Sequence, residues 1–259
     1  MTRYVRFKRD GAASWGVVDG EQIRALERAP WLSLEETGLT LGVTEATLLA
    51  PCEPSKILCV GKSYFDHALE ILDGSVPETP ILFIKPSTCV NDPGATIIRP
   101  RSSQALDYEG ELAFVVGKTA KRVKAADADD YIFGYTILND VTARDIQLAD
   151  GQWTRAKSFD GFAPIGPFLT TGIDPGDLAL TTRLNGVVQQ SSRTSLMMWS
   201  VPELLEFITE GITLLPGDVV TTGTPAGVGP MADGDTVEVE IEGLGALTNP
   251  VRWEDPTPA

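Results

Sequence analysis

Basic residues are scarce in this sequence. Of its 259 residues, 21 are Lys or Arg and 36 are Asp or Glu, which gives a formal net charge of -15. An acidic surface repels phosphate backbones and anionic lipid head groups, so we expect no nucleic-acid partner and no membrane partner. A small anionic substrate stays possible, because a positive pocket or a bound cation can overcome the overall charge.

Cysteines are few and long apolar runs are missing. Cys52, Cys59 and Cys89 form no Cys-x-x-Cys pair and are odd in number, which favours buried thiols in a reducing compartment over a disulfide framework. No stretch approaches the roughly 18 apolar residues of a membrane span, and residues 1–15 are charged throughout, unlike a signal peptide. We therefore expect a cytoplasmic protein.

Nucleotide-binding patterns are absent as well. Residues 221–229 form a glycine-rich segment after an apolar run, but they match neither GxxxxGK[ST] nor GxGxxG, and no good helix follows. We interpret this segment as a loop whose backbone N–H groups and Thr224 hydroxyl face a small anionic ligand.

Short strands separated by turn residues dominate what is present. In the first fifty residues, Asp-Gly turns separate the strand candidates Tyr4–Phe7, Trp15–Val18 and Ile23–Leu26, and a helical stretch is expected after them. Pro51 and Pro54 then favour a stiff linker. The sequence predicts a small N-terminal α+β domain over residues 1–52 and a larger domain over residues 53–259.

The larger domain is expected to be mainly β with a few helices. The alternation of Val237, Val239 and Ile241 with glutamates predicts a strand with one wet face. The best helix candidate is Pro202–Glu210, which Ser200 and Glu203 begin with capping-box spacing. The other strand candidates are Ile57–Val60, Ile81–Ile84, Leu112–Val116, Tyr131–Leu138 and Val219–Thr222.

Three carboxylates stand at the ends of apolar strand candidates. Glu109 and Glu111 are two residues apart, so in a strand they lie side by side, and Gly110 between them permits close approach of a backbone or a ligand. Asp140 ends another apolar run. Buried carboxylates repel one another, and a cation removes that cost; three oxygen ligands suit Mg²⁺, with Mn²⁺ or Ca²⁺ possible. The same spacing also fits a solvated strand edge and a turn.

The only histidine is His67, and Glu70 lies three residues after it. Ser63 and Asp66 favour a helix start, which places both side chains on one helical face. A carboxylate at that distance fixes the imidazole tautomer and raises its basicity, as a general base for water requires. An incidental pair on a surface helix gives the same pattern.

A polar cluster follows Asp140. Arg144 and Gln147 lie four and seven residues after it, on one face of a short helix. Arg144 can grip a substrate carboxylate, Gln147 can donate to an oxyanion, and Lys157 is a candidate cation for a developing enolate. Arg144 and Lys157 also fit ordinary surface charges.

In this order and spacing the residues resemble the fumarylacetoacetate hydrolase family, from about Lys56 to Val251. The resemblance implies a mixed β-sandwich roll with a smaller N-terminal domain, commonly as a homodimer. It places Mg²⁺ or Mn²⁺ on Glu109, Glu111 and Asp140, water activation on His67 and Glu70, and catalysis on Lys157. Arg144, Gln147 and Thr224, with Gly223 beside it, fall on substrate-binding positions.

The resemblance implies an enzyme acting on a small 2-oxo acid. Our first reading is a Mg²⁺-dependent carbon–carbon hydrolase of a 2,4-dioxo acid, such as an acylpyruvate or fumarylpyruvate, that acts through a metal-bound enolate. The alternative is an oxaloacetate decarboxylase, or an enol–keto tautomerase or isomerase of a related 2-oxo dicarboxylic acid, on the same site. A binding protein that only retains the scaffold is disfavoured, because each polar position is filled. Ser63 departs from the Asn of many relatives, which affects the substrate more than the metal site.

Overall fold

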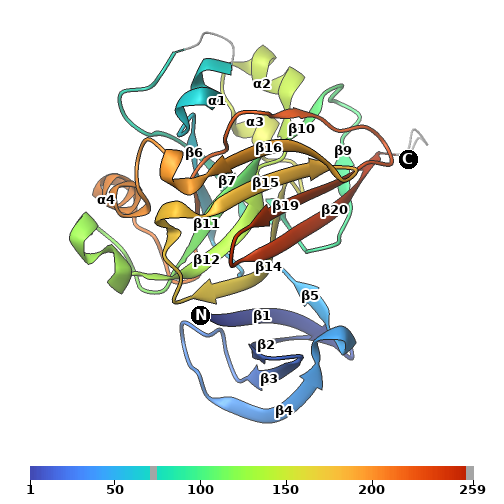
Figure 1. Cartoon of the computed structure of the whole chain (residues 1–259), viewed down its shortest axis with the longest axis vertical. Helices are drawn as coiled ribbons and strands as arrows, with labels where there is room; N and C mark the ends of the chain where they lie inside the picture. The colour runs from blue at the N-terminus through green and yellow to red at the C-terminus, as the bar shows by residue number, and fades with distance from the viewer. Residues whose placement is uncertain (71–74, 255–259) are drawn as a thin grey trace.

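The computed structural model describes residues 1–70 and 75–254, and strands form most of that part of the chain (Figure 1). The largest sheet has twelve strands, and β5 (Thr47–Leu49) and β8 (Val90–Asn91) pair with its β1 and β14. In spatial order the other ten are β4 (Glu36–Gly42), β3 (Gln22–Leu26), β2 (Ala12–Asp19), β1 (Thr2–Arg9), β14 (Ala163–Thr171), β12 (Ile132–Asn139), β11 (Gly110–Val116), β17 (Val219–Thr221), β6 (Lys56–Gly61) and β7 (Ile81–Pro86).

Two smaller sheets complete the β-structure. A five-stranded sheet holds β16 (Val187–Arg193), β15 (Ala179–Leu184), β19 (Thr236–Ile241), β20 (Gly245–Trp253) and β9 (Ile97–Arg99). A three-stranded sheet holds β13 (Thr142–Ala143), β10 (Leu106–Tyr108) and β18 (Gly229–Pro230). All the strand candidates taken from the sequence are found, and the mainly-β fold is confirmed.

Helices are short and few in the described part of the chain. They are α1 (Phe65–Glu70), α2 (Arg144–Asp150), α3 (Thr154–Lys157) and α4 (Val201–Gly211), with 3-10 turns at Val43–Glu45, Ser87–Cys89, Ala125–Asp130, Pro175–Asp177 and Thr194–Leu196. The predicted capping box of α4 is confirmed, since the Ser200 N–H donates to Glu203 at 2.7 Å. In Figure 1, α1, α2 and α3 gather at the end of the molecule opposite β1–β4.

The main core lies where the large sheet packs against the five-stranded sheet. The inward side chains of β19, including Val239 and Ile241, are 1% exposed and belong to one cluster with those of β11, such as Phe114. A Cβ on Gly110 would lie 2.3 Å from Thr182 Oγ1 of β15. Gly110 therefore permits the close approach of the five-stranded sheet. The sequence alone had allowed either a backbone or a ligand to approach at this position.

The N-terminal strands carry a small core of their own. Val5, Phe7 and Ile23 are fully buried there, and β1 joins the large sheet by pairing with β14. The expected helical stretch between Leu26 and Pro51 is wrong: β4 and β5 occupy it. The register that places Leu41 opposite Ile23 buries Leu41, and Gly38 adopts a left-handed φ of +84° that a helix does not allow.

The division at residues 52 and 53 stays a prediction, and residues 255–259 of the predicted larger domain lie outside the described part. The three cysteines are free and buried. Among the described residues, no helix is both long enough and apolar enough to cross a bilayer.

Candidate active site

The three predicted carboxylates meet in the interior. Glu109 lies between β10 and β11, Glu111 is in β11, and Asp140 directly follows β12. The neighbouring strands are tied at this point, because the Asp140 N–H donates to the Glu109 carbonyl at 2.8 Å. One oxygen of each side chain lies within 4.8 Å of the others, and the residues are 4%, 2% and 1% exposed. The alternative of a solvated strand edge is therefore excluded.

Three cations neutralise part of this charge, and one of them, Lys85, lies 2.6 Å from Asp140 Oδ1. The Lys157 ammonium group lies 2.7 Å from Glu109 Oε2 and 2.7 Å from Asp140 Oδ2. Arg144 donates to the other Glu109 oxygen at 2.5 Å. Burial alone would raise the pKa of Glu109, but Lys157 and Arg144 outweigh burial and hold that pKa well below its usual value.

Glu111 lacks such a partner. No Lys or Arg of the described residues forms an ion pair with Glu111, which accepts a hydrogen bond from the Gly223 N–H at 3.0 Å. Burial raises the pKa of Glu111 well above its usual value, and the charges of Asp140 and Glu109 raise the pKa further. A carboxylate in this setting needs additional positive charge to stay ionised.

The donor set fits a divalent cation. Glu111 has no cationic partner among the described residues, whereas Asp140 Oδ1 lies 2.6 Å from the ammonium group of Lys85. A buried carboxylate without a cationic partner is costly, and a metal ion supplies the positive charge that Glu111 lacks. Three carboxylate oxygens without nitrogen or sulfur suit a hard ion such as Mg²⁺ or Mn²⁺.

The His67–Glu70 pair lies on α1, the helix expected after Ser63. His67 Nδ1 is 3.4 Å from Glu70 Oε2, and the Glu70 carboxylate accepts the Gly227 N–H at 3.1 Å. His67 is 3% exposed, so an incidental surface pair is excluded. Burial lowers the pKa of His67 below 6.5, although the negative charges of Glu109 and Glu70 oppose that shift. The imidazole is therefore neutral and can accept a proton at neutral pH.

Arg144 begins α2 and organises the polar wall of the site. Its Nη1 donates to Gln147 Oε1 at 2.5 Å, and its Nε donates to Asp107 at 2.8 Å. Fixing the Gln147 oxygen orients the amide, whose NH₂ group remains a donor. Lys157 ends α3 and is 2% exposed. Burial alone would lower the pKa of Lys157, but Asp140 and Glu109 outweigh burial and raise that pKa, so Lys157 is a cation and not a base.

These groups line a cavity of about 290 Å³. All the predicted site residues except Glu70 and Gly223 face it: the lining is Val60, Gly61, Lys62, His67, Phe83, Glu109, Glu111, Asp140, Arg144, Gln147, Trp153, Lys157 and Thr224. The sequence analysis did not find its apolar wall, in which the rings of Phe83 and Trp153 pack edge to face with centroids 5.3 Å apart. A Cβ on Gly61 would lie 2.3 Å from the Trp153 ring. Trp153 stands four residues before Lys157 in the sequence, whereas Phe83 lies near no predicted site residue.

The glycine-rich loop differs from its expected role. The Gly223 N–H donates to Glu111, and the Thr224 hydroxyl donates to the Gly110 carbonyl at 2.9 Å and accepts from Gln190 at 2.8 Å. These donors therefore hold the strand that carries the carboxylates. Thr224 still lines the cavity. Because its hydroxyl hydrogen is donated to Gly110, the hydroxyl oxygen can only accept a hydrogen bond from a ligand.

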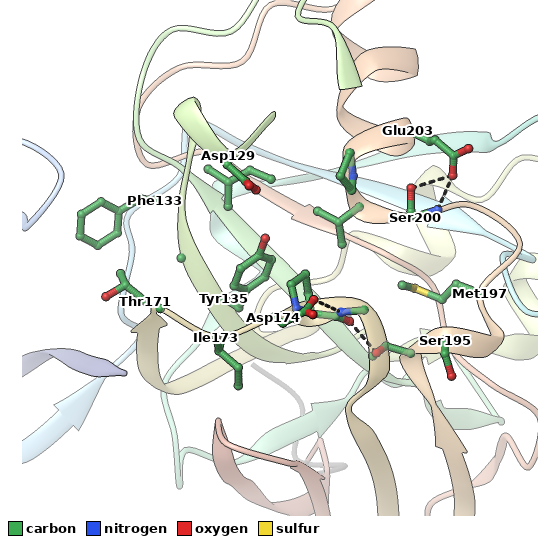
Figure 2. Close-up of a pocket in the computed structure, with 18 of the residues that line it drawn as sticks. Asp129, Phe133, Tyr135, Thr171, Ile173, Asp174, Ser195, Met197, Ser200 and Glu203 are labelled. Atoms are coloured by element: carbon green, nitrogen blue, oxygen red, sulfur yellow. Dashed lines mark hydrogen bonds between the residues drawn. The ribbon is translucent and has the colours of Figure 1, made fainter. Parts of the chain in front are cut away.

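A larger hollow of about 920 Å³ lies elsewhere, beside β12, the end of β14 and the start of α4 (Figure 2). Two of its carboxylates already serve local structure: Asp174 accepts the Gly176 N–H at 2.9 Å and Glu203 caps α4. Among the described residues, the carboxylates of this hollow do not form a cluster of three that could hold a metal ion. The smaller cavity is therefore the candidate active site.

Known proteins are similar to this chain over most of its length. The family model described as fumarylacetoacetate (FAA) hydrolase C-terminal matches residues 56–252, and a model described as Rv2993c-like, N-terminal matches residues 2–51. Oxaloacetate tautomerase Fahd2a, mitochondrial, from Rattus norvegicus is 41% identical over 220 residues, which are 80% of this chain and 70% of that protein.

Two solved structures superpose over nearly the whole chain. The crystal structure of 2-hydroxyhepta-2,4-diene-1,7-dioate isomerase from Mycobacterium marinum gives a TM-score of 0.91 at 44% identity, covering 98% of this chain and 99% of that chain. Fumarylacetoacetate hydrolase from Exiguobacterium antarcticum gives 0.87 at 37% identity, covering 98% and 100%. The chain belongs to the fumarylacetoacetate hydrolase family.

Proposed function

We propose that the chain is a divalent-metal enzyme that binds a 2-oxo acid and stabilises its enolate. The observation that carries the proposal is the buried trio Glu109, Glu111 and Asp140, in which Glu111 lacks a cationic partner among the described residues. A divalent ion bound there, Mg²⁺ or Mn²⁺, would draw electron density from the 2-oxo group and lower the energy of the enolate.

The surrounding side chains supply the other functions. Lys157 stays protonated in the cavity and can stabilise negative charge on an oxygen of the substrate, and Gln147 offers its amide N–H groups to the same end. Arg144 and Thr224 complete the polar wall that receives the carboxylate. Among the described lining residues, only His67 has a neutral nitrogen base, and Glu70 contacts it.

The first specific reaction that we propose is hydrolysis of a 2,4-dioxo acid such as an acylpyruvate. His67 would take a proton from water, and the resulting hydroxide would add to the distal carbonyl, where Lys157 and Gln147 face the developing oxyanion. The bond between that carbonyl carbon and its neighbour then breaks, and the electron pair passes to the enolate of the 2-oxo acid. The backbone anchor of Glu70 on Gly227 supports this reaction, because it fixes the partner of the base.

The second candidate is enol–keto tautomerisation, or decarboxylation, of oxaloacetate or a related 2-oxo dicarboxylic acid. The similarity to a protein named oxaloacetate tautomerase, at 41% identity, favours it. Tautomerisation needs only that one base move a proton between carbon and oxygen, and His67 can perform that step without water.

A side-by-side assay separates the candidates. The purified protein with Mg²⁺ is given acetylpyruvate, fumarylpyruvate and oxaloacetate, and pyruvate release, CO₂ release and the enol absorbance are followed. Hydrolysis predicts pyruvate from the first two substrates and its loss in His67→Ala, with a smaller effect on decarboxylation. Full activity in EDTA, or no turnover of any 2-oxo acid, would contradict the proposal.

We also propose a cytoplasmic homodimer in which residues 1–52 form a separate N-terminal domain. On the edge strand β7, the apolar side chain of Ile84 is 43% exposed, and a second subunit could cover it. Light scattering during size-exclusion chromatography tests the dimer, and a monomeric mass at micromolar concentration would contradict it.

A further inference from the structure

Strand β7 buries its charged residue and exposes two of its apolar ones, Ile81 and Ile84. Lys85 is 0% exposed, whereas Ile84 beside it is 43% exposed. Burying an ammonium group is costly unless it is fully paired, so a lysine in such a place needs a specific reason. Lys85 does not line the cavity, although it contacts Asp140, which does. No sequence pattern singled it out.

The ammonium group of Lys85 ties three segments together. It donates to the carbonyls of Val141, Lys157 and Phe162 at 3.1, 2.6 and 2.8 Å. Val141 follows a predicted metal ligand, Lys157 carries the cation of the cavity, and Phe162 follows α3. One side chain therefore fixes the backbone on both sides of the site.

Lys85 also touches a carboxylate of the trio. Its Nζ lies 2.6 Å from Asp140 Oδ1. An ammonium group has three hydrogens, and four oxygens lie within 3.1 Å of this one, so its hydrogens are shared among the three carbonyls and Asp140 Oδ1. Lys85 therefore holds Oδ1 in place relative to the three backbone segments.

We infer that Lys85 is a positioning residue, which holds Asp140 and the backbone of Lys157 in the arrangement that binds a divalent ion. Lys157 contacts two carboxylates of the trio, whereas Lys85 contacts only Asp140 and also donates to three backbone carbonyls. Groups that orient metal ligands in this way typically change metal affinity 10–100-fold when they are removed. The inference rests on the metal site proposed above.

The test is Mn²⁺ binding, measured by the EPR signal of the free ion, in the wild-type protein and in Lys85→Met. Methionine keeps the apolar stem and removes the ammonium group. If Lys85 acted only through its charge, its removal next to a ligand would tighten Mn²⁺ binding. Positioning predicts the opposite, a Kd about 10–100 times higher. An unchanged or lower Kd would overturn the inference.

Lys56 provides a matched control. Lys56 pairs with Pro86 and Ile57 pairs with Lys85, so the two lysines are neighbours whose side chains point to opposite faces of the sheet. Lys56 forms an ion pair with the fully buried Asp218. Lys56→Met should therefore lower the melting temperature and leave the Mn²⁺ Kd unchanged, which separates a loss of stability from a loss of positioning.

A second variant covers the case in which Lys85→Met does not fold. Lys85→Arg keeps the charge, but a planar guanidinium cannot reproduce three donors arranged around one nitrogen. We expect its Mn²⁺ Kd to rise at least tenfold, and wild-type affinity in Lys85→Arg would count against positioning. If the wild-type protein itself binds no Mn²⁺, the proposed function fails; if it binds and the Lys85 variants match it, only this inference fails.

Discussion

Replacing Lys157 by methionine gives the most informative stability prediction. The ammonium group is 2% exposed and bridges Glu109 and Asp140 at 2.7 Å each, so its loss leaves buried negative charge without its bridge. Removing one partner of a buried ion pair costs roughly 3–5 kcal/mol. Glu109 retains Arg144 and Asp140 retains Lys85 at 2.6 Å, so we expect the lower end, about 3 kcal/mol.

That cost can be measured by thermal unfolding. About 3 kcal/mol corresponds to a fall in melting temperature of roughly 6–12 °C for a chain of this size, measured in EDTA. Saturating Mg²⁺ should reduce the difference, because the ion supplies the missing positive charge. The surface pair of Lys124 and Glu206 provides the control, and Lys124→Met should change the melting temperature little. A fall below about 2 °C for Lys157→Met, or the same fall with and without Mg²⁺, would refute the reasoning.

Two further predictions concern the cavity. Burial lowers the pKa of His67 below 6.5, so the imidazole is neutral above that pKa, and activity should be lost as the pH falls through it. NMR titration of the single imidazole should give a pKa below 6.5 that matches the acid limb of the pH profile of kcat/KM. A higher pKa would contradict the assignment of His67 as the base. Gly61→Ala places a Cβ 2.3 Å from the Trp153 ring, so we expect the ring to shift and kcat/KM to fall at least tenfold. Gly211→Ala is the control, because a Cβ there meets no atom within 4 Å. Wild-type kinetics in Gly61→Ala would contradict the role of the apolar wall of the cavity.

Local patterns in the sequence predicted the strands well. The alternation in β19 and the capping box of α4 depend on neighbours a few residues apart, and both are present in the structure. The helical stretch before Pro51 failed because pairing with Ile23 buries Leu41, and that partner is remote in the sequence. Long-range pairing decided this segment against its local preference.

The site was predictable only in part, for a similar reason. The spacing of Glu109 and Glu111 placed two carboxylates together, but their burial and the approach of Asp140 depend on how β11 and β12 pair. Lys85 gave no signal of its own, since its three carbonyl partners come from residues 56 to 77 positions away. The sequence identified the backbone N–H groups and the Thr224 hydroxyl of residues 221–229 as hydrogen-bond donors. It did not show that Glu111 and Gly110 of β11 accept the hydrogen bonds of Gly223 and Thr224.

The most direct test of the central claim is a titration with Mn²⁺, followed by EPR, of the wild-type protein and of Asp140→Ala. The account predicts one ion bound per chain in the wild type, displaced by excess Mg²⁺, and loss of that binding in Asp140→Ala while the variant remains folded. A wild-type protein that binds no Mn²⁺, or an Asp140→Ala variant that binds the ion with wild-type affinity, would contradict a metal centre on Glu109, Glu111 and Asp140.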